Sequence, residues 1–551
     1  MECEVGMDQE GKVLIRSPED ALLQFNSRVL ANLTDWKERL GNDPLAMADL
    51  QQEVQIEFRK GADMLMAGMM IVIARLASFD EAAEQTRSTY DIPLTKGRVR
   101  SLRIRLLGGL VVWFKSLYCE PRRGWFRESN STDVPGLYIG LAQFGFANGT
   151  SPGLESHIAR RVAMSHSFDF AVEELQREGV GTDYNITRRI AYECGNGLLT
   201  LRKRELLAWR NKRLLPGSEL AGKRVGIQID GGRLKTRGAM TLKGGGLVPP
   251  AETQVQTEPT KKAIEHNAKL VDNGGRSKAN KGKKTFQSDW KEPKLVTIFI
   301  MDKQGKQLKG TKAWTEATLE GPDAIAEIIA MRLHQLGATQ AESITFVSDG
   351  APWIWDRLDR IVELAGIASS IPIYKVLDCC HAIGRMMAGL KHCGLGEKMT
   401  KGLYRVYRKL IREGRWEVVV LAFRKRLDRR KNLPEASRNE IRCVINYLQR
   451  HGEQGHLAYP QFGLLGLPLG SGAVESSIRR VINLRLKSNG SFWKASNAEA
   501  LLQLRSFYVC RRLDDRLADK RVSLSQNGKL DWETTYPDLA KNADRLLANS
   551  A

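Results

Sequence analysis

Three acidic residues stand where phosphodiester chemistry with divalent cations would need oxygen ligands. Asp230 follows the apolar run VGIQI, Asp349 follows ITFVS, and Glu475 lies in GSGAVESS. The first two segments predict β-strands that run into a glycine turn, and the third predicts the first turn of a helix. Two hard cations that share a phosphate need oxygen ligands from several rigid elements, and two strand ends and a helix start can supply them.

Each of these residues, taken alone, has a simpler interpretation. Asp and Gly are favoured in any turn, so an Asp-Gly pair after a strand is common. A Glu in the first turn of a helix commonly compensates the helix dipole. The order Asp, Asp, Glu favours the catalytic interpretation, because the segments between these residues predict an ordered succession of strands and helices.

The composition indicates a polyanionic partner. The 551 residues carry a net charge of +22, which points to nucleic acid first and to an anionic membrane surface second. A chain of this length with 42% hydrophobic residues predicts several domains. The polar start MECEVGMDQEGK has no export signal, and the most apolar run, 64–76, is interrupted by Arg75 and is too short to cross a bilayer. We therefore expect a cytoplasmic protein with reduced cysteines, no membrane segment and a Met-rich buried helix at 64–76.

The N-terminal part of the chain predicts three regions. Residues 1–85 predict a helical region, and residues 86–150 predict a small β-rich subdomain in which VRSLRIRLLGGLVVWFKSLYC alternates basic and apolar residues. Such a ribbon could pack one face and offer basic side chains on the other, namely Arg98, Arg100, Arg103 and Arg105. Residues 151–205 predict a helix, a glycine turn and a second helix. This is the outline of a helix-turn-helix reader, in which Arg188 and Arg189 would contact DNA, although helical hairpins in general share it.

The C-terminal part predicts an α/β core that is interrupted by helices. Strands alternate with helices over residues 206–378, apart from a Gly- and Lys-rich stretch at 231–294 that we expect to be a flexible basic loop. Residues 379–459 predict a basic, all-helical insertion, residues 460–515 complete the core and contain Glu475, and residues 516–551 form a C-terminal tail. The expected fold class is multidomain, with helical, β-rich and helix-turn-helix regions before an α/β core that contains an all-α insertion.

This succession of elements resembles the ribonuclease H-like catalytic core of DDE transposases. Four segments resemble bacterial insertion-sequence transposases of the Kra type in sequence: QIDGGRLK, FVSDGAPWIWDRL, YKVLDCCHAIGRM and LPLGSGAVESSIRRVINLRLKSNGSFW. By this resemblance Asp230, Asp349 and Glu475 would hold two Mg²⁺ or Mn²⁺ ions per active site. The protein would cut double-stranded DNA at the terminal inverted repeats of its element and join the ends to target DNA. The resemblance also implies a homodimer or higher homo-oligomer on DNA, associated with the nucleoid of a bacterium.

The segment DCCHA adds a second signature. Asp378 ends the next predicted strand, and His381 follows three residues later. Mutator-like and hAT-like transposases, which have helical insertions, carry a similar pattern, and by that similarity Asp378 and His381 would line the active site and orient the scissile phosphate. Metal binding by Cys379, Cys380 and His381 is the rival interpretation, but adjacent cysteines lack the usual zinc spacing. Relatives often carry a cysteine pair in the N-terminal β region, where this chain has only Cys119, so zinc is in doubt there too.

The helix that begins near Glu475 predicts an apolar side and a basic ridge. At 100° per residue, four apolar residues share one side: Val474, Ile478, Val481 and Ile482. Basic residues on and after this helix would contact the DNA backbone: Arg479, Arg480, Arg485 and Lys487. An ordinary amphipathic surface helix shows the same pattern.

Two rival functions stay open beside transposition. A catalytically inactive DNA-binding protein derived from a transposase would keep the basic surface without needing all three carboxylates. A nuclease with a ribonuclease H fold would cleave DNA without strand transfer. The three carboxylates and their flanking glycines disfavour the first rival, and the basic insertion and the helix-turn-helix outline disfavour the second.

Overall fold

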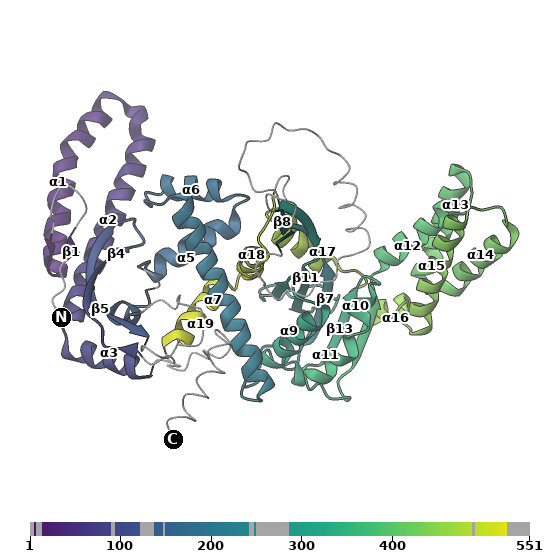
Figure 1. Ribbon diagram of the computed structural model, residues 1–551. Helices are drawn as coiled ribbons and strands as arrows, with labels where there is room; N and C mark the ends of the chain where they lie inside the picture. Colours follow the sequence, from purple (N-terminus) through teal and green to yellow (C-terminus); the bar gives the residue numbers. More distant parts are fainter. Residues whose placement is uncertain are drawn as a thin grey trace, which may run out of the picture. The chain divides into compact units, whose positions relative to one another are not determined.

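The computed structural model of the chain describes residues 5–6, 14–89, 94–121, 137–146, 149–241, 247–248, 286–487 and 491–525. The chain divides into two compact units, one of residues 1–204 with 513–551 and the other of residues 205–512. Figure 1 shows mixed α/β architecture.

The first unit begins with helices, as predicted for residues 1–85. They are α1 (Pro18–Asn42), α2 (Met47–Ala74) and α3 (Ala77–Thr89), with a 3₁₀ turn at Pro44–Ala46. The Met-rich segment lies in α2, where Met64 and Ile71 are fully buried, so this prediction is confirmed. Over the described ranges no single helix is long and apolar enough to cross a membrane. The pair α2 and α3 passes that test together, by length and composition only, with a bend of 82° between them.

An antiparallel hairpin packs against α2. Its strands β4 (Val99–Arg105) and β5 (Val111–Pro121) pair in one continuous register, and Ile104 and Phe114 join the same hydrophobic cluster as Met64. Alternate residues of a strand face opposite sides. Arg103 and Arg105 therefore share one face, whereas Arg100 lies on the face of the buried Ile104, with its guanidinium over the Tyr118 ring at 4.3 Å. The prediction of a single basic face is thus wrong at Arg100.

The short strands of this unit are β1 (Val5–Gly6), β2 (Leu14–Ile15), β3 (Leu94–Thr95) and β6 (Leu137–Tyr138).

Helices complete the first unit: α4 (Ile139–Gln143), α5 (Pro152–Met164), α6 (Phe168–Arg177), α7 (Tyr184–Arg210) and α19 (Leu513–Ser525). Residues 205–210 of α7 belong to the second unit. The Ser151 and Ser167 hydroxyls accept backbone N–H groups in the first turns of α5 and α6, which explains where these helices start. α6 and α7 confirm the predicted pair of helices, but their connection, 178–183, is longer than the three or four residues of a DNA reader. α19 starts before the predicted tail, and its Lys520 forms a buried ion pair with Glu155 of α5.

The second unit is built on a five-stranded mixed sheet in the order β12-β11-β7-β13-β14. β11 is antiparallel to both β12 and β7, whereas β13 is parallel to both β7 and β14. The bounds are β7 (Arg224–Gly231), β11 (Lys294–Ile300), β12 (Trp314–Thr318), β13 (Ser343–Ser348) and β14 (Ile373–Leu377). Every residue of β11, β12 and β13 is buried, which explains the apolar runs in β11 and β13, whereas β12 buries the polar residues Thr315, Glu316 and Thr318. The predicted alternation of strands and helices is present from β12 to β14, whereas β11 and β12 follow one another without a helix between them.

Short helices connect and cover this sheet. α9 (Pro322–Gln335) packs against α11 (Leu358–Leu364), α17 (Gly472–Ile478) packs on β7 and β11, and α18 (Ala495–Val509) packs on β12. A 3₁₀ turn at Ala338–Gln340 follows α9. Two helices follow Asp349, because α10 (Pro352–Trp355) ends at Asp356 before α11 begins.

Part of the predicted flexible loop, 231–294, is an antiparallel sheet. β8 (Leu234–Thr241) pairs with β10 (Phe286–Lys291) and with β9 (Leu247–Val248). Leu234 and Thr236 are buried and alternate with Lys235 and Arg237, a period of two that is too short and too polar to identify from the chain alone. The loop prediction is therefore wrong for β8 and β10, and residues 242–246 and 249–285 lie outside the described residues.

The predicted insertion at 379–459 is helical throughout its elements. Its helices are α12 (Cys379–Lys391), α13 (Glu397–Arg412), α14 (Trp416–Arg429) and α15 (Glu435–Glu453), and α16 (Tyr459–Leu464) begins at its last residue. Figure 1 shows α12 to α15 side by side. Their shared core contains Met386, Ile411, Phe423 and Val444. This helical segment thus has a hydrophobic interior of its own and an exposed basic surface.

Candidate active site

β13 pairs with β7 on one side and with β14 on the other, and an aspartate follows the last paired residue of each of these ladders. Ile229 is the register partner of Ser348, and Ser348 is the partner of Leu377. Because the three strands are parallel and neighbouring strands lie about 4.8 Å apart, the next residues meet at one edge of the sheet. These residues are Asp230, Asp349 and Asp378.

A buried amide ties the helix of Glu475 to the strand of Asp230. Gln228, two residues before Asp230, is only 3% exposed. Its Nε2 donates to the Gly470 carbonyl at 3.1 Å, and its Oε1 accepts the backbone N–H groups of residues 473 and 474 at 2.9 and 3.0 Å. Glu475 follows in the first turn of α17, as predicted. Gln228 is not among the residues predicted for the site, and its signal in the sequence is a polar residue inside the apolar run VGIQI.

Asp378 connects the insertion to the segment before α17. It is 1% exposed, and its Oδ1 accepts the His381 backbone N–H at 2.9 Å, which caps α12. Its Oδ2 accepts both the backbone N–H and the hydroxyl of Ser471, the latter at 2.6 Å. Because both carboxylate oxygens already accept hydrogen bonds from the protein, Asp378 is placed to position its neighbours.

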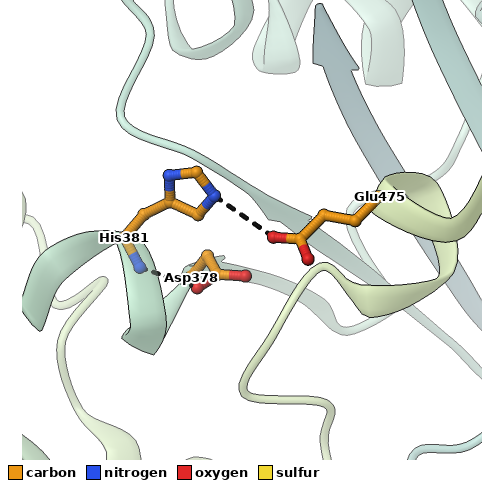
Figure 2. Close-up of side chains that lie close together, drawn as sticks. All are labelled: Asp378, His381 and Glu475. Carbon is orange, nitrogen blue, oxygen red and sulfur yellow. Dashed lines mark hydrogen bonds and ion pairs between the residues drawn. The ribbon is translucent and has the colours of Figure 1, made fainter. Parts of the chain in front are cut away.

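His381 and Glu475 lie face to face above Asp378. Figure 2 shows the His381 ring and the Glu475 carboxylate pointing toward one another, with Nε2 and Oε1 3.3 Å apart. Asp378, His381 and Glu475 each offer one possible ligand atom, and these atoms lie within 4.8 Å of one another. The Glu475 side chain is 51% exposed, so packing does not hold it in this one orientation.

Electrostatics link Asp230 to the rest of the cluster. Burial, and after it the charge of Asp349, raise the pKa of Asp230 to about 6. His381 acts against this shift, and Glu475 adds to it. Carboxylates near one another at this sheet edge repel each other when they are ionised. A bound cation would offset this repulsion. Carboxylate oxygens are hard donors, so Asp230, Asp349 and Glu475 fit Mg²⁺ or Mn²⁺ better than a softer metal.

The insertion packs directly on the turn that carries Asp349. A Cβ at Gly350 would lie 1.9 Å from the Tyr447 ring of α15, so this glycine is required for the close approach. The Arg450 guanidinium donates to the Gly350 carbonyl at 3.4 Å, and the Asp349 carboxylate accepts the Ala351 N–H at 3.0 Å. α15 therefore takes part in positioning a predicted metal ligand.

The basic residues predicted around the last helix divide into two groups. Arg479, Arg480 and Lys487 are exposed. Arg485 is only 4% exposed, and its guanidinium lies 5.4 Å from the centre of the Trp493 ring. The prediction that Arg485 contacts DNA is therefore wrong for this structure, because its charge lies inside the unit. The apolar side is confirmed, although a π-helical turn at Arg479–Asn483 interrupts the regular helix.

The residues predicted to read DNA in the first unit are exposed on α7. Arg188 lies over the Tyr184 ring at 5.5 Å, and Arg189 pairs with Glu193 at 3.0 Å. Thr187, next to them, is buried and hydrogen-bonded to Thr182 at 2.8 Å. The arginines are thus accessible, and the residue before them anchors the helix.

Comparison with known proteins adds little. No protein family model matches the chain, and no curated protein matches it. One solved structure, the Drosophila P element transposase strand transfer complex, is similar with 11% identity and a TM-score of 0.29, over 66% of this chain and 93% of that chain. Similarity of this degree says nothing about function, so the site itself must carry the functional conclusion.

Proposed function

We propose that the protein is a DNA transposase that cuts and joins DNA strands with metal ions held by Asp230, Asp349 and Glu475. The placement of these residues on adjoining elements supports the proposal. Two carboxylates end neighbouring strands in register, and the third begins a helix that Gln228 attaches to the same strand. The raised pKa of Asp230 supports it, because a bound cation would relieve the crowding of negative charge. The strand order, with three antiparallel strands followed by two parallel ones, fits a ribonuclease H-like core.

Some residues of the site would bind the metal ions, and others would position the residues around them. Mg²⁺ or Mn²⁺, two ions per site, would lower the pKa of a bound water or 3′-hydroxyl and stabilise the leaving oxygen. Asp230, Asp349 and Glu475 would hold the ions. Asp378 keeps α12 and the Ser471 segment in place, and it thereby sets His381 3.3 Å from Glu475, where its ring can orient Glu475 or a phosphate oxygen.

Charge supports double-stranded DNA as the partner. Residues 379–459 contain eighteen Lys and Arg against seven Asp and Glu, so this insertion carries half of the net charge of +22. A surface of this kind attracts the phosphate backbone. Processing of two element ends would require at least two copies of the protein on DNA.

The test is a cleavage assay on duplex DNA that carries the ends of the element, with Mg²⁺ and then Mn²⁺. Asp349→Asn should abolish cleavage and leave DNA affinity equal or higher, because it removes a metal ligand and one negative charge. Asp359→Asn, which changes an aspartate with an 87% exposed side chain on α11, is the matched control and should cleave normally. Full cleavage by Asp349→Asn would overturn the assignment.

The same assay separates the rival functions. A nuclease without strand transfer would use the same carboxylates, so joined products must be followed as well as cut ones. Cleavage without joining would favour that nuclease. Tight end-specific binding without cutting under either metal would favour an inactive DNA-binding protein.

A further inference from the structure

Helix α13 (Glu397–Arg412) carries a row of exposed cations on one side. At 100° per residue these side chains fall within an arc of about 100°. We call them the α13 cation row: Lys398, Lys401, Arg405, Arg408, Lys409 and Arg412. The opposite side of the helix holds the half-buried Tyr407 and the fully buried Ile411, which pack in the insertion. The row therefore faces away from the hydrophobic interior.

The stability of the helix does not explain this row. Its members are spaced three and four residues apart, and like charges at these spacings destabilise a helix. Two of them have acidic partners on or next to the helix: Lys401 lies 2.6 Å from Glu397, and Lys409 lies 3.8 Å from Glu413. Exposed pairs of this kind contribute little and exchange readily. A polyanion bound on this side would attract these cations and offset their mutual repulsion.

The row ends beside the candidate active site. α13 packs against α12, whose first residue, Cys379, directly follows Asp378. Burial raises the pKa of the Cys379 thiol, and the charge of Arg412 and a hydrogen bond from it act in the opposite direction. Arg412, the last member of the row, is therefore a neighbour of the segment that holds Asp378 and His381. From there to Lys398 the helix extends about 21 Å, at 1.5 Å per residue.

We infer that the α13 cation row binds the phosphate backbone of the DNA duplex whose scissile phosphate occupies the carboxylate site. The inference rests on the proposed function for the location of that phosphate. A row of about 21 Å spans roughly six base pairs of duplex. Contacts to phosphates carry no sequence information, so the row would hold the flank of the cleavage site without selecting its sequence.

The experiment compares two double variants of the full-length protein that lose the same charge. Arg405→Gln/Arg408→Gln removes the middle of the row, and Arg429→Gln/Arg430→Gln removes two exposed cations from the end of α14 as the control. DNA affinity is measured without divalent cations between roughly 50 and 200 mM salt. The row variant should reduce the slope of log Kd against log salt by about 1.8, since each lost phosphate contact contributes about 0.9. The control should change the slope much less.

A series of shortened duplexes tests the length of the contact. Wild-type affinity should fall when fewer than about six base pairs remain on one side of the cleavage position, and the row variant should not show this loss. A slope no lower than that of the control, or an unchanged dependence on length, would overturn the inference. Thermal unfolding of both variants checks that α13 remains folded.

This design distinguishes a failure of the α13 cation row to bind DNA from a failure of the carboxylate site to cleave it. Binding is measured without metal, so the row can be confirmed even if the protein never cleaves DNA. Conversely, Asp349→Asn should lose cleavage and keep the salt slope of the wild type.

Discussion

At Asp230, burial and the neighbouring charge of Asp349 raise the carboxyl pKa from 3.8 to about 6. Between these values the folded protein holds a proton that the unfolded chain has released. Stability therefore falls as the pH rises from about 4 to about 6, and it stays lower above that range. A shift of this size corresponds to roughly 3 kcal/mol at neutral pH. Without a bound cation, the buried carboxylate therefore lowers the stability of the folded protein. A bound cation would offset this loss.

Asp230→Asn should therefore stabilise the second unit and abolish cleavage. The gain in the free energy of unfolding should be up to roughly 3 kcal/mol near pH 7.5 and much smaller near pH 4.5, where the wild-type carboxyl is protonated. Urea unfolding at both pH values, without divalent cations, measures it. Added Mg²⁺ should stabilise the wild type more than the variant. An equal gain at both pH values would show that charge is not the cause.

At the scale of elements, Gln228 joins β7 to α17. Gln228→Met removes its three hydrogen bonds in a buried position and leaves the partner groups unpaired, at a cost of about 1–3 kcal/mol for each of them. Glu475 would lose its fixed position relative to Asp230. We expect a lower cleavage rate and a higher Mg²⁺ concentration for half-maximal rate, with DNA affinity unchanged.

Gln304→Met is the matched control for this prediction, because Gln304 is exposed in the turn after β11. It should leave the Mg²⁺ requirement of the wild type unchanged. A loss of rate in Gln228→Met without any change in the Mg²⁺ requirement would indicate a general loss of stability instead.

At the scale of the whole molecule, exposed arginines and carboxylates lie in different units. Arg188 and Arg189 are exposed on α7 in the first unit, whereas Asp230, Asp349 and Glu475 belong to the second. Arg188→Gln/Arg189→Gln should weaken binding to element ends by roughly tenfold or more and should lower its salt slope. Cleavage of DNA at saturating concentration should persist. Competition between end-bearing and unrelated duplexes measures the effect.

The variant of the α13 cation row is the natural comparison, because it removes the same charge from the second unit. It should weaken binding to all sequences alike, whereas the α7 variant should act mainly on element ends. Equal affinity and an equal salt slope in the wild type and the α7 variant would exclude residues 168–195 as the reader of the ends.

Local patterns in the sequence were sufficient for the main elements of both units. The apolar runs before Asp230 and Asp349 predicted strands, the segment around Glu475 predicted a helix start, and residues 379–459 predicted helices. These features depend on neighbours within a few residues, so composition and periodicity encode them. The residue types at the strand ends also pointed to oxygen ligands before any contact was known.

Tertiary structure alone decided what these residues contact. The register that places Asp230, Asp349 and Asp378 side by side depends on strands far apart in the chain. The pairing of β8 with β10 and the burial of Arg485 against Trp493 depend on equally distant partners. A local pattern cannot specify such partners, because pairing and burial are properties of the packed unit. The sequence therefore determined which groups are present, and packing determined which of them meet.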